Sequence, residues 1–186
     1  MSRPGRPAPP RRQLLSLDAM QRRWKIYAGI AFLAAFSDQL TKLWARSALP
    51  VDGAGRGIRV SVVENFFDLV LAHNTGAAFS LLADQSGGRV LLSVLGVVGV
   101  GAITWMAARA RPDEVGLVAA LGLMVGGAIG NLVDRIRLGT VTDFVLWRWY
   151  EHTWPVFNVA DVCLSVAIGI FAAHSLRTLL RGRSAD

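Results

Sequence analysis

The sequence predicts an all-α membrane protein: four transmembrane helices with a small extracytoplasmic β-sheet between helices 1 and 2. The first observation is composition: 53% of the 186 residues are hydrophobic and 18% are charged, which is apolar for a soluble domain of this length. The second is the grouping of apolar residues into four blocks, each near the ~20 residues that cross a bilayer. The third is a set of basic clusters at the ends of these blocks, which is typical of membrane topology signals.

The four apolar blocks are separated by polar or charged segments. They run from about Trp24 to Trp44, from Val90 to Ala108, from Val115 to Leu132 and from Val156 to Leu176. The core of the first block, residues 26–36, follows a basic stretch and has the length of a signal-peptide apolar region. Apolar character resumes at Leu40, however, and no small-x-small cleavage site stands clearly after the core. We therefore expect the first block to be a retained helix.

Basic residues indicate the orientation. They crowd the N-terminus, the link between the second and third blocks, and the C-terminus: Arg3, Arg6, Arg11, Arg12, Arg22, Arg23, Lys25; Arg109, Arg111; Arg177, Arg181, Arg183. Four crossings with both termini in the cytoplasm place all three clusters inside. The net charge of +7 is then explained by membrane boundaries and anionic lipid heads, and we expect no nucleic-acid partner.

The same orientation divides the chain into parts. We expect a disordered basic cytoplasmic extension over residues 1–22, a four-helix membrane domain over 23–178 and a basic cytoplasmic tail over 179–186. A β/loop segment at about 47–88 and a loop at about 136–155 then face outward. In the first of these, the β-branched and aromatic residues of 59–71 predict strands, and residues 74–79 predict a turn. The resulting sheet would rest on the outer membrane face.

Polar residues inside the blocks converge at one depth. They form three groups: Asp38 and Lys42; Asn131, Asp134 and Arg135; Asn158 and Asp161. Within each group the residues are three or four apart, so they share a helical face. A rise of 1.5 Å per residue places Asp38 and Asn131 about 21 and 24 Å from the cytoplasmic end, and Asp161 about 8 Å below the outer edge. In a core of ~30 Å, this predicts one site near the outer face.

Asp143 and Asp161 are the candidate catalytic residues. Each is an isolated carboxylate in an apolar run, and an acid against lipid is costly and rarely retained without a function. Asp143 follows the third block closely enough to fold back to the depth of Asp161. Two carboxylates in a low-dielectric site share one proton, which is the chemistry of aspartic peptide hydrolysis and requires no metal. Ordinary loop and helix-start acids are the alternative interpretation.

Two other functions compete with hydrolysis. A proton-coupled carrier could use Asp38, Asp143 and Asp161 as a relay, but it should have polar residues across the full membrane depth and inverted repeats. The sequence has no internal repeat. A non-catalytic assembly partner, held by its glycines, would tolerate the loss of either acid.

Several further patterns have structural interpretations. Gly122, Gly126 and Gly130 recur every four residues and predict close helix approach, although Gly127 and Gly130 could also leave room for substrate. Glu64 and Asp68 are expected on a solvated strand face, and Cys163 as a packed thiol. The tryptophans of the second outer segment fit an interfacial belt: Trp147, Trp149 and Trp154.

Four sequence blocks carry a resemblance to a known family. They are Asp38-Gln-Leu-Thr-Lys42; Asn74-Thr-Gly-Ala-Ala-Phe79; Gly130-Asn-Leu-Val-Asp-Arg135 with Gly139-Thr-Val-Thr-Asp-Phe144; and Phe157-Asn-Val-Ala-Asp161. In order and spacing they resemble the blocks of bacterial lipoprotein signal peptidases, also called type II or prolipoprotein signal peptidases. The resemblance covers about residues 24 to 176, and four blocks on a four-span layout make it specific.

The resemblance implies an intramembrane aspartic endopeptidase of the bacterial inner membrane. Its substrate would be a prolipoprotein, cut on the N-terminal side of a diacylglyceryl-modified cysteine, with membrane lipids as the other partners. Asp143 and Asp161 would form the catalytic pair and Asp38–Lys42 a structural pair. The substrate-binding set implied by the resemblance is Asn74, Asn131, Arg135 and Asn158. The glycine pattern, independently of the resemblance, adds Gly127 and Gly130 to the expected set. We expect no cofactor, no metal, and a monomer.

Overall fold

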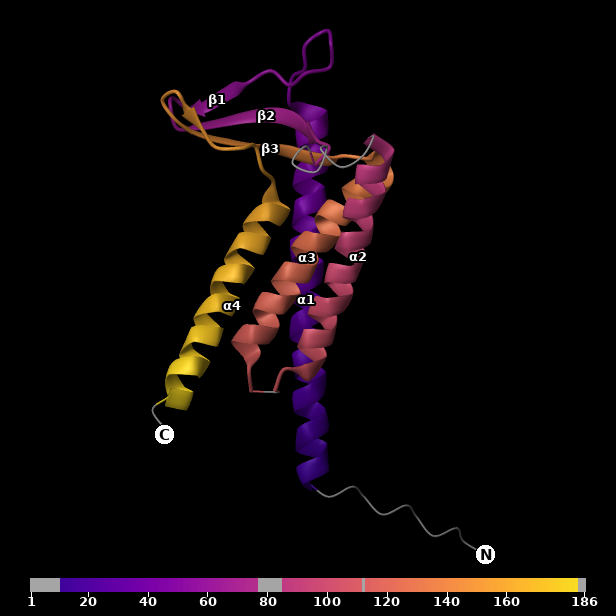
Figure 1. Cartoon of the computed structure of the whole chain (residues 1–186), viewed down its shortest axis with the longest axis vertical. Helices are drawn as coiled ribbons and strands as arrows, with labels where there is room; N and C mark the ends of the chain where they lie inside the picture. The colour runs from indigo at the N-terminus through magenta and orange to yellow at the C-terminus, as the bar shows by residue number, and fades with distance from the viewer. Residues whose placement is uncertain (1–10, 77–84, 112, 184–186) are drawn as a thin grey trace, which may run out of the picture.

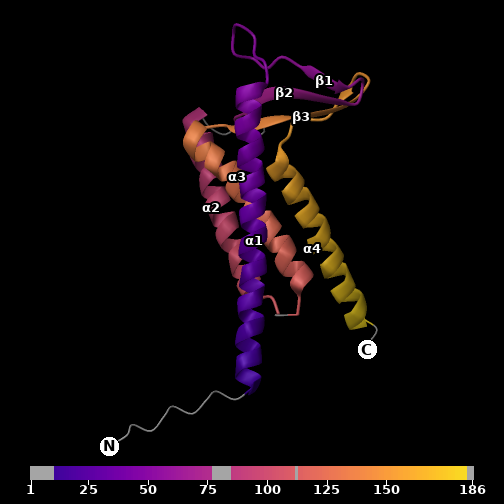
Figure 2. The same cartoon turned by 180° about the vertical axis from the view of Figure 1, so that it is seen from behind.

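A computed structural model describes residues 11–76, 85–111 and 113–183 of the chain. Its elements are α1 (Arg11–Ala48), β1 (Val60–Val63), β2 (Phe67–Asn74), α2 (Gln85–Arg109), α3 (Val115–Leu138), β3 (Val141–Trp149), β4 (His152–Thr153) and α4 (Val159–Arg183). The helices run roughly lengthwise, and the sheet lies across one end of them (Figure 1). The N-terminal end of α1 and the C-terminal end of α4 both lie at the opposite end of the molecule (Figures 1 and 2).

The structure is that of a helical membrane protein. Three helices of the described part are long and apolar enough to cross a bilayer: Gly87–Arg109, Val115–Leu138 and Val159–Leu180. Large apolar side chains on the outside of the bundle are exposed, among them Val98 at 61% and Ile168 at 58%. Water would make such surfaces costly, whereas lipid tails accommodate them. α1 is not among the three, because Asp38 and Lys42 interrupt its apolar block.

The first and last helices extend further than expected. α1 begins at Arg11, so residues 11–22, predicted to be disordered, are helical. No Gly or Pro interrupts this stretch, and its Leu, Arg, Gln, Ala and Met residues favour helix. α4 continues to Arg183, into the predicted tail. Residues 1–10 and 184–186 of the two predicted terminal segments lie outside the described residues.

Glycines of α3 allow two other helices to approach it closely. A Cβ atom at Gly122 would meet the backbone of Tyr27, and one at Gly126 would meet Ala31 and Ala34, all on α1. The predicted packing stripe is therefore confirmed. This close approach also explains why α3 is the most buried of the three candidate membrane spans.

The expectation that Gly127 and Gly130 leave room for substrate is wrong. A Cβ at Gly127 would meet the Ala160 carbonyl oxygen and Leu164 of α4, and one at Gly130 would meet the Asp38 carboxylate. Both positions are filled by neighbouring helices. A four-residue repeat in sequence does not reveal which helix fills each gap.

Gly126→Ala is expected to destabilise the bundle. The added methyl group would overlap the Ala31 carbonyl oxygen and the Ala34 side chain, and overpacking of this kind costs about 1–3 kcal/mol. Gly99→Ala is the matched control, because a Cβ there meets nothing within 4 Å. Thermal unfolding in detergent should show a lower midpoint for Gly126→Ala only. Equal midpoints for the two variants would contradict the close α1–α3 packing.

The sheet draws strands from both outer segments. It is antiparallel, with the order β1-β2-β3-β4. The prediction of strands between helices 1 and 2 holds for β1 and β2. The prediction of a plain loop over 136–155 is wrong, since β3 and β4 lie there. The β-branched and aromatic residues of β3 are the same signal that identified the first two strands.

One acid of the sheet is buried, contrary to expectation. Glu64 is exposed, but Asp68 is fully buried, with its Oδ2 atom 2.8 Å from Arg148 Nε and 3.6 Å from Arg59 Nε. Its cross-strand partner is Leu146, which is 5% exposed. This face of the sheet is therefore covered. The tryptophans expected at the interface are exposed: Trp147, Trp149 and Trp154.

Candidate active site

The first turn of α4 holds Asp161 through a reciprocal cap. The Asp161 backbone N–H donates to Asn158 Oδ1 at 3.1 Å, and the Asn158 backbone N–H donates to Asp161 Oδ2 at 3.2 Å. This is a capping box, which satisfies two N–H groups that a helix start leaves without partners. The other carboxylate oxygen, Oδ1, accepts from Asn131 Nδ2 at 3.0 Å. The local fold thus fixes the orientation of the Asp161 carboxylate.

β3 brings Asp143 to the same place. The Phe157 carbonyl oxygen accepts hydrogen bonds from the N–H groups of Phe144 and Val145 at 3.0 and 2.9 Å, so β3 is tied to the residue just before Asn158. On its other side, β3 pairs with β2, whose register shifts between Leu69 and Ala72. Such an irregularity re-aims nearby side chains. Asn74 at the end of β2 donates to Asp143 Oδ2 at 3.0 Å.

Asn158 joins the two aspartates. Its Nδ2 atom donates to Asp143 Oδ1 at 2.6 Å, while its Oδ1 atom and backbone N–H bond Asp161. The structure therefore brings the two predicted catalytic residues together, with no helix packed between them. Asn158 itself is fully buried, so its contacts fit a positioning role rather than the predicted contact with substrate. Asn131 is 8% exposed, and its side chain likewise makes its hydrogen bonds within the site, which also fits a positioning role.

The environment of Asp143 favours its protonated form. The side chain is 2% exposed, and burial raises its pKa to about 6. The neighbouring charge of Asp161 also raises the pKa, while hydrogen bonds from Asn74 and Asn158 lower it. Desolvation is the largest of these effects, because removal of water penalises the ionised carboxylate. Asp143 is thus poised for proton transfer near neutral pH.

A buried ion pair supports the site from the α1 side. Lys42 Nζ lies 2.9 Å from Asp38 Oδ2, and both side chains are fully buried, as the four-residue spacing predicted. Lys42 also donates to Asn131 Oδ1 at 2.8 Å, which leaves the Asn131 amide nitrogen for Asp161. Asp38 Oδ1 accepts from the backbone N–H of Ala160 at 2.9 Å. Asp38 therefore satisfies another N–H group at the start of α4 and fixes that helix against α1.

Asp134 and three partners belong to the same network, and sequence reasoning missed most of them. Asp134 Oδ2 accepts from the backbone N–H of Thr142 at 2.8 Å, and Arg46 donates to the Thr142 hydroxyl at 2.8 Å. Gln39 donates to the Gly130 carbonyl at 2.9 Å. A signal for Arg46 was present, because it continues the four-residue spacing of Asp38 and Lys42. Thr142 carries no such signal, because it lies in β3 rather than on a helix, although both its hydroxyl and its backbone N–H make contacts.

Asn74 and Arg135 are the accessible members of the predicted substrate-binding set. Asn74 is exposed and Arg135 is half-buried. Within the described residues, the Arg135 guanidinium makes no hydrogen bond. It interacts electrostatically with the carboxylates of Asp161, Asp143 and Asp134. Its donors remain available for a carbonyl or carboxylate group. Residues 77–79 of the predicted turn lie outside the described residues.

The arrangement is suited to acid–base chemistry. It combines two carboxylates, one of them deeply buried, with neutral amides that fix their orientation. Cys163 is half-buried and free. Across residues 11–76, 85–111 and 113–183, no three His, Cys, Asp or Glu side chains gather into a group that could hold a metal ion. The fold and the site define a helical membrane protein with a pair of linked aspartates.

Comparison with known proteins identifies the family. The sequence model of a family described as signal peptidase (SPase) II matches residues 30–177. A lipoprotein signal peptidase of Syntrophotalea carbinolica is 39% identical over 159 residues, covering 86% of this chain and 96% of the relative. Another, from Pseudomonas putida, is 42% identical over 152 residues, covering 80% and 85%. The chain belongs to the signal peptidase II family, and it is therefore a peptidase.

Solved structures agree on the fold. Two structures described as bacterial membrane enzymes superpose on the chain with TM-scores of 0.71 and 0.69, at 23% and 24% identity. Each covers 81% of this chain, and the matched parts are 92% and 87% of the two neighbours. The helical bundle with its terminal sheet is thus the fold of known membrane enzymes. The family resemblance seen in the sequence blocks is confirmed by the family match.

Proposed function

We propose that this chain is an aspartic endopeptidase that removes signal peptides from prolipoproteins, cutting on the N-terminal side of a diacylglyceryl-modified cysteine. The observation that carries the proposal is the contact of Asn158 with both Asp143 and Asp161, in a chain of the signal peptidase II family. The named activity of the relatives supplies the substrate class. The linked carboxylates supply a means to cut a peptide bond.

In the proposed reaction, a water molecule held between the carboxylates is the nucleophile. The ionised aspartate takes a proton from the water as its oxygen attacks the scissile carbonyl carbon, and the protonated aspartate donates to the carbonyl oxygen. The tetrahedral intermediate then collapses: the carbon–nitrogen bond breaks as the nitrogen gains a proton. The signal peptide leaves with a new carboxyl group, and the lipid-modified cysteine with a free amine.

We assign the starting proton of the pair to Asp143. Burial raises the pKa of this carboxyl to about 6, whereas Asp161 is more exposed and sits in the first turn of α4, where a helix N-terminus favours a negative charge. Asp143 is then the acid and Asp161 the base. Arg135 and Asn74 are the proposed contacts for the peptide backbone of the substrate. Asn131 and Asn158 lie behind the carboxylates and position them. The residues that in turn support these two asparagines are Gln39, Arg46 and Thr142.

A pH–rate profile is expected to show a falling limb near pH 6. Only protonated Asp143 can donate to the carbonyl oxygen, and its protonated fraction falls as pH rises through a pKa of about 6. Measured kcat/KM should therefore decline above that pH. Asn74→Ala removes a hydrogen bond that lowers the Asp143 pKa, so its limb should move to higher pH. A limb that stays in place, or moves lower, would contradict the assignment of Asp143 as the acid.

The distribution of charge supports a proposed membrane orientation. We propose that α1 crosses the bacterial inner membrane as a fourth span, its Asp38 and Lys42 neutralised against each other and turned inward. The start of α1 and the end of α4 lie at the end of the bundle away from the sheet (Figure 2). Both would be cytoplasmic, because basic residues crowd these two segments of the sequence. The aspartate pair would then lie near the outer face. The acyl chains of the substrate would remain among lipid between the helices. We propose that the enzyme acts as a monomer.

Cleavage of a defined precursor tests the proposed function. The purified chain is incubated in detergent with two synthetic precursors that differ only in the diacylglyceryl group on the cysteine. We expect cleavage of the lipidated precursor only, directly before the cysteine, with mass spectrometry reporting both products. A cut at another bond, or equal rates on the two precursors, would contradict the substrate assignment. Loss of activity with a chelator and recovery with a divalent ion would contradict metal-free aspartate chemistry.

A further inference from the structure

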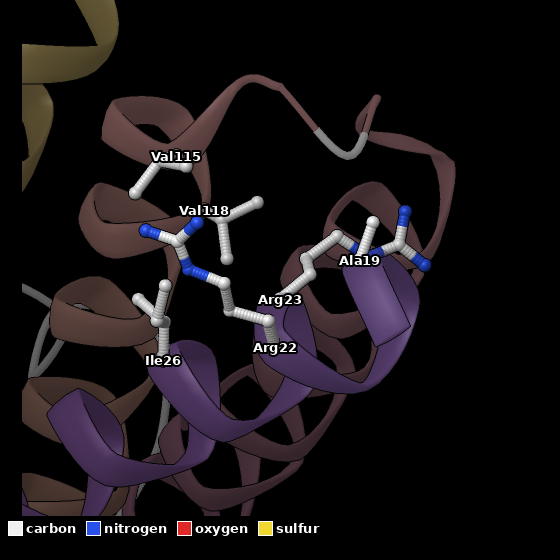
Figure 3. Close-up of a pocket in the computed structure, with 6 residues that line it drawn as sticks. All are labelled: Ala19, Arg22, Arg23, Ile26, Val115 and Val118. Atoms are coloured by element: carbon white, nitrogen blue, oxygen red, sulfur yellow. The ribbon is translucent and has the colours of Figure 1, made fainter. Parts of the chain in front are cut away.

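A small hollow lies between α1 and the start of α3, at the end of the bundle away from the sheet. Its volume is about 50 Å³, and it is lined by Ala19, Arg22, Arg23, Ile26, Val115 and Val118. In Figure 3 the side chains of Arg22 and Arg23 leave α1 in different directions, and Arg22 reaches toward Val118 of α3. A water needs about 10–15 Å³ on this scale, so the hollow holds roughly four water-sized groups. That is the size of one phosphate group.

The side chains of Arg22 and Arg23 have few hydrogen-bond acceptors around them. Arg22 makes no hydrogen bond or ion pair with any residue of the described ranges. Arg23 donates to the Ala110 carbonyl oxygen through one terminal nitrogen, but its Nε atom is buried without a partner. Arg22 is exposed, so the penalty falls on Arg23 Nε, because buried donors without acceptors are uncommon and costly. An oxygen-rich anion in the hollow would supply acceptors to both side chains.

Nearby acids do not neutralise the hollow. Glu114 accepts from the Arg111 backbone N–H at 2.7 Å and lies 3.5 Å from His174 Nε2. Asp113 is paired with Arg111 at 2.9 Å. Asp18, one helical turn before Arg22, forms no ion pair within the described part of the chain. The hollow therefore keeps a positive charge.

Its walls and its depth favour a lipid over a free anion. Ile26, Val115 and Val118 give the hollow an apolar side, which suits a glycerol and acyl chain but offers nothing to inorganic phosphate. Arg23 lies 19 residues before Lys42 on α1, or about 28 Å along the helix. This is close to the ~30 Å thickness of a bilayer core. With the aspartate site near one face, the hollow falls at the headgroup layer of the other face.

We infer that this hollow binds the phosphate headgroup of an anionic phospholipid from the leaflet opposite the aspartate pair. Arg22 holds the phosphate through its guanidinium and Arg23 through its buried Nε atom, because the terminal nitrogens of Arg23 point away from Val118 (Figure 3). The acyl chain lies along the apolar residues of α1 and α3. The bound lipid also connects α1 to the α2–α3 link, which Arg23 already contacts at Ala110. The site is separate from the catalytic carboxylates. It belongs to the enzyme whether or not substrate is present.

A lipid titration of the full-length chain tests the inference. The protein is purified in a neutral detergent and titrated with phosphatidylglycerol, and native mass spectrometry counts the retained lipid. Arg22→Gln should weaken binding roughly tenfold, as expected for the loss of hydrogen bonds to a charged group. Arg22→Lys keeps the charge and should retain most of the binding. Because Arg22 has no partner in the described structure, its variants should fold, which circular dichroism checks.

Two controls decide between specific and diffuse binding. Lys25→Gln removes the same charge three residues away, on an exposed position that does not line the hollow, and should leave binding unchanged. Phosphatidylcholine, which carries no net charge, should bind at least several-fold more weakly. Equal losses in Lys25→Gln and Arg22→Gln would overturn the inference in favour of diffuse attraction. Displacement of the lipid by equimolar inorganic phosphate would overturn it in favour of a free-anion site.

Discussion

Asp143→Asn and Asp161→Asn are each expected to reduce cleavage of a lipidated precursor by roughly 10³-fold, within the range that acid–base groups contribute. An amide keeps the shape of a carboxyl group but cannot exchange the proton that the pair shares. Each variant should remain folded. Asn at position 161 can still accept from the Asn158 N–H, and Asn at position 143 can still accept one of the two amide hydrogen bonds. The measurement is the initial rate at saturating substrate.

The matched control is Glu64→Gln. Glu64 is an exposed acid in the outer segment and belongs to no part of the proposed site, so this variant should cleave at the normal rate. Retained turnover in either aspartate variant would reject the pair as the catalytic groups. Loss of turnover in Glu64→Gln would show that the assay responds to charge in the outer segment generally.

Lys42→Met is expected to destabilise the protein by about 3–5 kcal/mol, the cost of leaving a buried charge without its partner. Lys42 is fully buried and touches Asp38 at 2.9 Å and Asn131 at 2.8 Å. Without it, the Asp38 carboxylate remains among α1, α3 and α4, and the Asn131 amide is free to turn away from Asp161. Both the thermal midpoint and the cleavage rate should fall. Unfolding can be followed by tryptophan fluorescence.

An exposed ion pair of the same spacing provides the control. Asp52 and Arg56 are also four residues apart and 2.8 Å from each other, but the Arg56 side chain is 82% exposed. Arg56→Met should cost less than about 1 kcal/mol. Adding Asp38→Asn to Lys42→Met should recover part of the lost stability, because the unpaired charge is gone. A double variant less stable than Lys42→Met alone would contradict the burial argument.

The sequence predicted the helical part of the site well. Spacings of three and four residues placed Asp38 with Lys42 and Asn158 with Asp161, because side chains of one helix share a face regardless of what surrounds it. The depth estimate brought these groups together because a bilayer restricts helices to crossing in nearly one direction. Those are local or one-dimensional rules, and they need no knowledge of packing.

The contacts that depend on strand pairing and helix docking could not be read in this way. Asp68 was expected in solvent, yet the pairing of β2 with β3 buries it beside Arg148. Gly127 was expected beside substrate, yet α4 fills the space. In both cases the deciding neighbour is tens of residues away in sequence. The same limit hid the role of Asn158, whose partners come from β3, α3 and α4 together.

The central claim is that Asp143 and Asp161 act as one unit, and a comparison of single and double substitutions tests it most directly. Residual rates of Asp143→Asn, Asp161→Asn and the double variant are measured on the same lipidated precursor. Two groups that act together in one concerted step give non-additive losses, so the three residual rates should be equal within a few-fold. A double variant whose loss is the product of the two single losses would contradict the account.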